Sequence, residues 1–277
     1  MNRFLTKYIS IKESHPDIAG RMPDDVENVL YNSLYTYKEG NEEVFAKLDK
    51  LVWTNFLDCR IDEYNPKRFG YCILDDGING NCIKKFALID FLLSEIENLR
   101  KSEGENIPSF ARELNKGFER VNYEYRIIGN HVTPITDPEE IKEIENANLM
   151  VSDNIRVHLD CALRELSKKN GADFRVSVHE SLSAVEAFCE KYTGTDILSK
   201  ALSLFDKKKK MHPQIIKAFE NLYCYSSDKK TGSRHGLAVE DDTYVPTFYE
   251  AKFMFVVCSA FINYMRGKFG EELEDNI

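Results

Sequence analysis

A short segment in the second half of the chain combines the side chains that metal-independent RNA cleavage requires. Asp228 and the adjacent pair Arg234-His235 lie within eight residues of one another, and Gly232 and Gly236 flank the pair. Such cleavage needs a base for the 2′-OH, an acid for the 5′-oxygen and a cation for the charged phosphorane. Imidazole titrates near neutral pH, and guanidinium holds phosphate oxygens through two hydrogen bonds. The segment therefore predicts an acid–base and phosphate site, and the alternative is a charged surface loop.

A second group of polar residues follows the period of a helix. Arg175, His179, Ser183 and Glu186 are separated by steps of four and three, which places them on one side of an expected helix. The opposite side of that helix is apolar. The stripe is either a solvated face or one wall of a cleft opposite the Arg234-His235 pair.

The histidines and cysteines do not form the patterns of a metal site or a disulfide framework. The 6 histidines are scattered, and none is paired with another His or a Cys at ligand spacing. The 7 cysteines are odd in number and widely spaced, without a CxxC pair. P-loop, dinucleotide-binding and HExxH motifs are also absent. We expect no metal and no cofactor, and reduced cysteines in a cytoplasmic protein.

Composition restricts the classes of protein that remain. The 277 residues are 43% hydrophobic and 30% charged, enough for both a core and a solvated surface. No uncharged apolar run approaches about 18 residues and no signal-like apolar block follows Met1, so we expect no membrane partner. Residues 1–150 hold 19 Lys/Arg against 27 Asp/Glu, whereas residues 151–277 hold 18 against 19. This balance makes non-specific nucleic-acid binding a poor hypothesis, but it leaves room for a local basic site in the second half.

The expected fold is mainly α, with an N-terminal helical domain that contains a small β-hairpin and a C-terminal helical bundle. The boundary is expected near residues 148–153, which gives domains 1–150 and 151–277. Apolar spacing and end signals predict the first domain's helices at 23–40, 42–57, 83–101, 108–120 and 136–149, with a hairpin within 123–135 and an irregular segment at 58–82. The same signals predict the helices of the second domain at 153–170, 173–194, 195–205, 213–226 and 246–269.

Several blocks of this sequence resemble one family of bacterial proteins. The block RVSVHESLSAVE at 175–186 resembles the motif R-x-S-[IV]-x-E-S-[IL]-S-A-V-E, and blocks within 212–237 and 251–264 resemble HPA…AF..LYGYTSD..GIRHAL and AKFMLVSCSAFVNYL. Upstream, residues 125–141 resemble the end of the associated N-terminal domain. Together these blocks resemble the AbiJ-type abortive-infection proteins, in which an AbiJ-like N-terminal domain precedes a C-terminal HEPN-like domain.

The resemblance implies a dimeric helical bundle and, as in many HEPN proteins, metal-independent RNase activity used in phage defence or toxicity. In the usual signature, four to six residues separate the Arg from the His, whereas Arg234 and His235 are adjacent here. Under this hypothesis Arg234 binds the scissile phosphate, His235 is the acid–base, and Glu180 or Asp228 orients the imidazole. The expected RNA-binding residues are Arg175, His179, Lys229 and Lys230.

The leading hypothesis is therefore an endoribonuclease effector of abortive infection that cleaves RNA by 2′-OH attack, with tRNA as one candidate substrate. We expect a homodimer through the C-terminal domain, and an N-terminal domain that senses a phage-derived trigger or a partner protein. The alternative is a non-catalytic HEPN-like module that binds a protein partner or RNA. A small-ligand sensor is a third class, which only the unexplained N-terminal domain favours, and nothing in residues 1–120 names a ligand.

Overall fold

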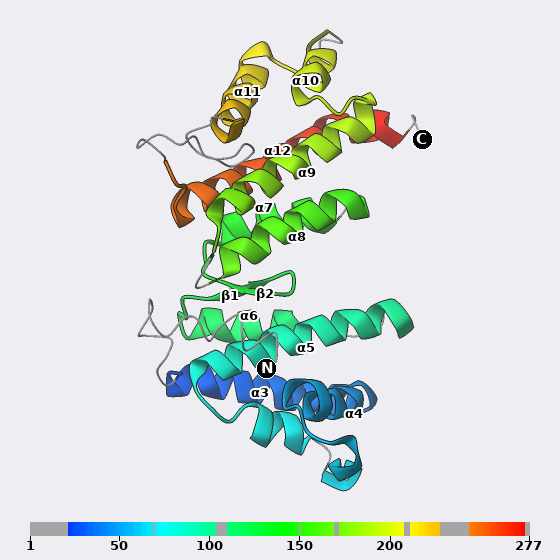
Figure 1. Ribbon diagram of the computed structural model, residues 1–277, viewed down its shortest axis with the longest axis vertical. Coiled ribbons are helices and arrows are strands. Elements are labelled where there is room, and N and C mark those ends of the chain that lie inside the picture. The colour runs from blue at the N-terminus through cyan, green and yellow to red at the C-terminus, as the bar shows by residue number, and fades with distance from the viewer. Residues whose placement is uncertain are drawn as a thin grey trace. The chain divides into compact units, whose positions relative to one another are not determined.

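The computed structural model describes residues 22–68, 70–103, 110–149, 151–168, 172–207, 211–227 and 244–274 (Figure 1). This described part is mainly helical and carries one two-stranded antiparallel hairpin, which confirms the expected fold class. The chain divides into two compact units. The first holds Met1–Thr136 with Ser167–Gly171, and the second holds Asp137–Leu166 with Ala172–Ile277. None of the helices in the described ranges is long and apolar enough to cross a membrane.

The first unit begins with α3 (Asp24–Gly40), which follows Pro23 as the sequence predicts. Proline fits the entry of a helix, and the acidic residues of the first turn face the positive end of the helix dipole. The helix buries Val26, Leu30 and Leu34 and packs on α6 (Phe110–Arg120). The next helix, α4 (Glu42–Leu51), also contacts α3.

The segment after α4 differs from the sequence prediction. The expected helix over 42–57 changes into the π-helical turn η2 (Val52–Phe56), and residues 58–82 contain η3 (Ile61–Glu63), η4 (Pro66–Arg68) and η5 (Cys72–Gly77). Hydrogen bonds between residues that are distant or several positions apart in the sequence hold this segment in a defined conformation. The buried carboxylate of Asp49 accepts a hydrogen bond from the Ile73 N–H at 3.0 Å, and the Trp53 indole N–H donates to the Arg60 carbonyl at 2.8 Å.

The hairpin lies where the sequence predicts it, against α5 (Cys82–Glu103) and α6. Strands β1 (Arg126–Ile128) and β2 (His131–Thr133) pair with Ile127 opposite Val132. Asn115 of α6 fixes this edge, because its amide donates to the Ile127 carbonyl at 2.6 Å and accepts from the Ile127 N–H at 2.7 Å. The turn passes through Gly129 with φ +57°, in the left-handed region that glycine adopts without strain.

The second unit is a helical bundle built around α12 (Phe248–Glu274). Its other helices are α7 (Pro138–Leu149), α8 (Asp153–Ser167), α9 (Phe174–Thr193), α10 (Leu198–Lys207) and α11 (Pro213–Ser227). Helix α12 lies beside α9 and α7, and α10 contacts both α9 and α11 (Figure 1). Gly194 ends α9 with φ +69°, as its position after the apolar run predicts.

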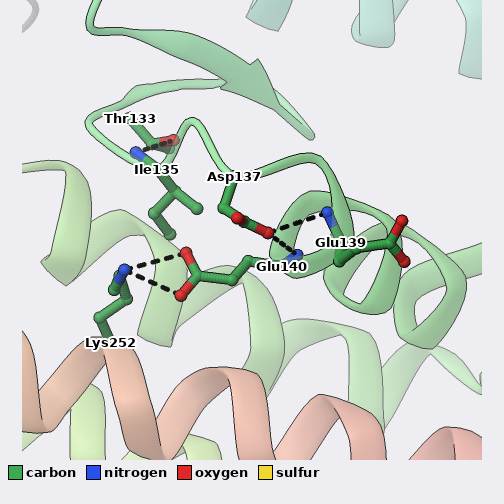
Figure 2. A network of polar contacts seen from close by, with 6 residues as sticks. All are labelled: Thr133, Ile135, Asp137, Glu139, Glu140 and Lys252. Carbon is green, nitrogen blue, oxygen red and sulfur yellow. Dashed lines mark hydrogen bonds and ion pairs between the residues drawn. The ribbon is translucent and has the colours of Figure 1, made fainter.

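Helix α7 is attached to α12 by polar contacts. The Asp137 carboxylate caps α7 by accepting from the Glu139 and Glu140 N–H groups, each at 3.0 Å, and the Glu140 carboxylate in turn accepts two hydrogen bonds from Lys252, at 2.8 and 2.9 Å (Figure 2). The Asn263 amide further along α12 donates to the Glu143 carboxylate at 2.7 Å. These contacts place α7 in the second unit, whereas the predicted domain boundary near residue 150 lies at the far end of this helix.

Candidate functional site

The segment that carries the predicted acid–base pair lies outside the described residues. This applies to Asp228, Lys229, Lys230, Arg234 and His235, whose roles stay predictions. The described part of the candidate site is the facing surface of α8 and α9, which holds the other predicted residues. Its geometry decides what chemistry those helices can contribute.

Small side chains link α9 to the backbone of α8. The Ser177 hydroxyl donates to the Ala162 carbonyl at 3.0 Å, and the Ser181 hydroxyl donates to the Ser177 carbonyl at 2.7 Å. Both serines are completely buried, so their hydroxyls are satisfied inside the unit rather than by water. The bond from Ser177 to α8 fixes the position of the nearby Glu180, one turn along α9, relative to α8.

Glu180 forms the central contact of the site with a histidine from α8. The His158 Nδ1 atom lies 2.7 Å from Oε2 of Glu180. The two side chains keep 30% and 22% of their surface exposed, so the pair is accessible without being fully solvated. When Nδ1–H donates to the carboxylate, Nε2 has a free lone pair and can accept a proton from a substrate. From the sequence, either Glu180 or Asp228 is instead expected to orient His235.

A thiol lies one helical turn beyond His158. Cys161 accepts a hydrogen bond from the Arg164 guanidinium at 3.5 Å. Burial raises the pKa of the Cys161 thiol, and the negative charge of Glu180 acts in the same direction, while Arg164 opposes both. A neutral thiol is a weak nucleophile, so the structure assigns no nucleophilic role to Cys161.

The first predicted RNA-binding residue, Arg175, is already paired with a carboxylate. Its Nε and Nη2 atoms donate to the two carboxylate oxygens of Asp173 at 2.8 and 2.9 Å. Asp173 also caps α9 by accepting from the Arg175 N–H, and the Arg175 side chain is the main reason that the pKa of Asp173 is lowered. The negative charge of Asp173 offsets the positive charge of the Arg175 guanidinium, and this weakens the attraction of Arg175 for an RNA phosphate.

The second predicted RNA-binding residue, His179, lies on the same helix one turn later. Its Nδ1 atom is buried and has no hydrogen-bond partner among the described residues. Further along the expected polar stripe, Ser183 is buried with 9% of its surface exposed. The stripe is therefore not a uniformly solvated face, because its middle is enclosed by the bundle.

The described residues of the second unit thus provide a carboxylate–imidazole pair as their clearest chemical group. In the described ranges, no set of three or more His, Cys, Asp or Glu side chains is arranged to hold a metal ion. A carboxylate that orients one nitrogen of an imidazole leaves the other nitrogen for proton transfer, which is general acid–base chemistry.

The sequence did not single out His158, which is one of the 6 scattered histidines. Local spacing could not reveal the contact, because His158 and Glu180 lie on different helices and meet only when α8 and α9 pair in this register. The sequence held one signal of this contact: the Glu180 carboxylate lies among small serine residues. Small residues allow another helix to approach closely, so a side chain of that helix can reach the carboxylate.

Comparison with known proteins identifies the first half of the chain. Residues 16–149 match the family model of AbiJ N-terminal domain 4. No curated protein and no solved structure matches the chain. The predicted AbiJ-like N-terminal domain is therefore confirmed over these residues. The HEPN-like character of the second half stays a prediction.

Proposed function

We propose, from the AbiJ N-terminal domain at residues 16–149, that the chain is an abortive-infection effector whose second unit is a metal-independent endoribonuclease. The reaction would be attack of an RNA 2′-OH on the adjacent phosphate. It forms the bond from the 2′-oxygen to phosphorus and breaks the bond to the 5′-oxygen, which leaves a 2′,3′-cyclic phosphate and a 5′-hydroxyl.

The contact between His158 and Glu180 carries this proposal. A carboxylate at 2.7 Å from Nδ1 orients the ring and stabilises the imidazolium that forms when Nε2 accepts the 2′-OH proton. The partial exposure of both side chains lets a substrate reach the free nitrogen. The pair therefore supplies the general base.

The other two functions belong to the segment that first suggested the chemistry. Arg234 would bind the phosphate oxygens and stabilise the charge of the phosphorane, and His235 as imidazolium would protonate the leaving 5′-oxygen. Lys229 and Lys230 would contact the RNA backbone. In this division the adjacency of Arg234 and His235 is no obstacle, because the base comes from α8.

Cleavage of total RNA or tRNA in EDTA tests the proposal. We expect His158→Ala and His235→Ala to slow cleavage by about 10²–10⁴-fold, the usual contribution of a general acid or base. Glu180→Gln should slow it less, because the amide still occupies the site but cannot stabilise an imidazolium. Product ends are read as 2′,3′-cyclic phosphate.

The matched control is Glu190→Gln, which removes an exposed carboxylate from the same helix and should leave cleavage unchanged. Circular dichroism melts separate loss of chemistry from loss of fold. Full activity of both histidine variants, or an inactive wild type isolated from phage-infected cells, would overturn the assignment.

A non-catalytic module is the second candidate, and two observations favour it. Arg175 is held by Asp173, which leaves less charge for phosphate. In addition, Tyr249 and Phe253 of α12 are 75% and 54% exposed, as expected of residues that bind a protein partner. Co-purification of a partner that depends on Phe253 but not on His158 would favour this function.

A further inference from the structure

Helix α7 belongs to the first domain by its sequence and to the second unit by its contacts. The AbiJ family match over residues 16–149 includes the whole of α7, whereas the helix packs on α12. Residues 134–137 join α7 directly to strand β2 of the first unit. Helix α7 is therefore the part of the second unit that a change in the first unit reaches first along the chain.

Few apolar side chains hold α7 in the bundle. Its buried residues are Ile144 and Ala147, and Leu149 at its end stays 72% exposed. Helix α9 in the same unit buries a larger apolar set, which consists of Val178, Leu182, Ala184, Val185, Phe188 and Cys189. Because the hydrophobic contribution grows with the apolar area removed from water, it holds α7 less firmly than α9.

Polar contacts supply a large share of the attachment of α7. Lys252 donates to both oxygens of Glu140, at 2.8 and 2.9 Å, and the Asn263 amide donates to the Glu143 carboxylate at 2.7 Å. Lys252 and Asn263 are eleven positions apart, close to three turns of a helix, so both side chains leave α12 on the same side. The pair of Glu140 and Lys252 is the charged one, and each side chain is 27% exposed.

The charged pair lies at the end of α7 that joins the first unit. Asp137 caps this end through the N–H groups of Glu139 and Glu140, and the side chain of the same Glu140 reaches Lys252 (Figure 2). Ile135 in the connection to β2 has no exposed surface, which anchors the chain just before the cap. A movement of this connection therefore acts on the first turn of α7.

We propose that the first turn of α7 is a latch, in which the pair of Glu140 and Lys252 holds α7 on α12. Its release lets α7 leave α12 while the other helices of the second unit stay folded. A change in the first unit would act on this latch through residues 134–137 before it acts on any other helix of the second unit. The latch gives the chain a route for regulation, and it does not depend on RNA cleavage.

Hydrogen exchange of the full chain, read by mass spectrometry of its peptides, tests the proposal. In the wild type we expect the amides of α7 to exchange faster than those of α9, because α7 opens without the rest of the bundle. Lys252→Met should speed the exchange of α7 about tenfold and leave α9 unchanged, since the half-buried Glu140 then lacks its partner. Glu140→Gln should have a smaller effect, because its amide oxygen still accepts one hydrogen bond. The matched control is Lys217→Met, which removes an exposed lysine of α11.

Ile135→Ala tests the route from the first unit. This variant loosens the buried connection before the cap and should speed the exchange of α7 by a factor of about 3, again without an effect on α9. Wild-type exchange of α7 in this variant would overturn the route.

Other outcomes would overturn the latch itself. They are equal exchange of α7 and α9 in the wild type, equal acceleration of both helices by Lys252→Met, and an effect of Lys217→Met as large as that of Lys252→Met. Circular dichroism melts show whether each variant is folded, and Asn263→Ala, which removes the neighbouring contact, replaces Lys252→Met if that variant is not. None of these outcomes depends on whether the chain cleaves RNA.

Discussion

Asp49 is a carboxylate with no exposed surface in the core of the first unit. Its oxygens accept hydrogen bonds from the Ile73 N–H at 3.0 Å and from the Tyr64 hydroxyl at 3.2 Å. Burial raises the pKa of Asp49, and the hydrogen bonds partly oppose this rise. Burial and the Asp49 charge together raise the pKa of Tyr64 to about 12. This one side chain therefore connects α4 to η5, although burial disfavours its charged form.

The pKa of Asp49 predicts how stability changes with pH. Because the folded-state pKa lies above the unfolded value of about 4, the folded protein holds this proton more tightly. Its contribution to the free energy of unfolding is fully present below the unfolded pKa and is lost as the pH rises through the folded pKa. Asp49→Asn has no such proton, so it should gain stability relative to the wild type as the pH rises from about 4 through the folded-state pKa of Asp49.

Urea unfolding of both proteins across this range measures the difference. Asp49→Ala should be destabilised by about 1–3 kcal/mol, because it leaves the buried N–H of Ile73 without its acceptor. The exposed-site variant Glu39→Gln should follow the pH dependence of the wild type. Parallel curves for the wild type and Asp49→Asn would contradict the prediction.

For individual residues, the sequence predicts contacts within one helix but does not predict contacts between different helices. The helix starts at Pro23 and Asp173 were predicted correctly, because proline and a capping carboxylate act on the first turn of their own helix. The contact from Asp49 to Ile73 and that from His158 to Glu180 could not be predicted. Each joins residues more than 20 positions apart, and only tertiary packing brings them together.

Among the elements, α3 and α6 pack tightly against each other at a glycine of α6, Gly117. An ideal Cβ built on Gly117 would lie 2.2 Å from Cγ1 of Val29, which no real contact allows. Glycine inside a helix normally costs about 0.5–1 kcal/mol relative to alanine. At this position the missing side chain instead permits the pairing of two helices in the core of the first unit.

Gly117→Ala should therefore destabilise the protein, against the usual effect of helix propensity. We expect a loss of about 1–3 kcal/mol in the free energy of unfolding, because α6 must move away from the buried Val29. The matched control is Gly40→Ala at the end of α3, where a new Cβ meets nothing within 4 Å. Denaturant unfolding should show that variant unchanged or slightly stabilised, and an equal loss in both would refute the close approach.

The boundaries of helices and strands were also predicted where they depend on nearby residues and missed where they depend on distant ones. The hairpin and the helices of both units were predicted because apolar spacing, prolines and glycines act locally. The π-helical turns η2 and η5 were missed, since a π turn differs from an α turn only in its hydrogen-bond partner. The segment over 58–82 also lacks long apolar periodicity, although Ile73 is fully buried.

For the whole molecule, the composition of the chain and the contacts within the fold place a division at different residues. The change in charge and pattern predicts a boundary near residue 150, and the AbiJ family match ends at residue 149. Contacts within the fold assign α7 to the second unit, through Lys252 and Asn263 of α12. Sequence patterns cannot show this assignment, because the polar residues that attach α7 resemble ordinary surface residues.

The surface of α12 motivates a final proposal about assembly. The bundle buries most of this helix, including Phe255, Cys258 and Ile262, each with no exposed surface. Tyr249 and Phe253 stay 75% and 54% exposed one turn apart. Large aromatic side chains are enriched at protein interfaces, and a strip on one helix can face its own copy across a two-fold axis.

We propose that the chain forms a homodimer through this strip of α12. Light scattering at micromolar concentration should give twice the monomer mass of 32.0 kDa. Phe253→Asp should weaken association at least tenfold, because it buries two unpaired carboxylates at the axis. Ile61→Glu, a control that changes a 55% exposed side chain of the first unit, should remain dimeric. A monomeric wild type would refute the dimer, and a dimer that survives removal of residues 151–277 would refute this interface.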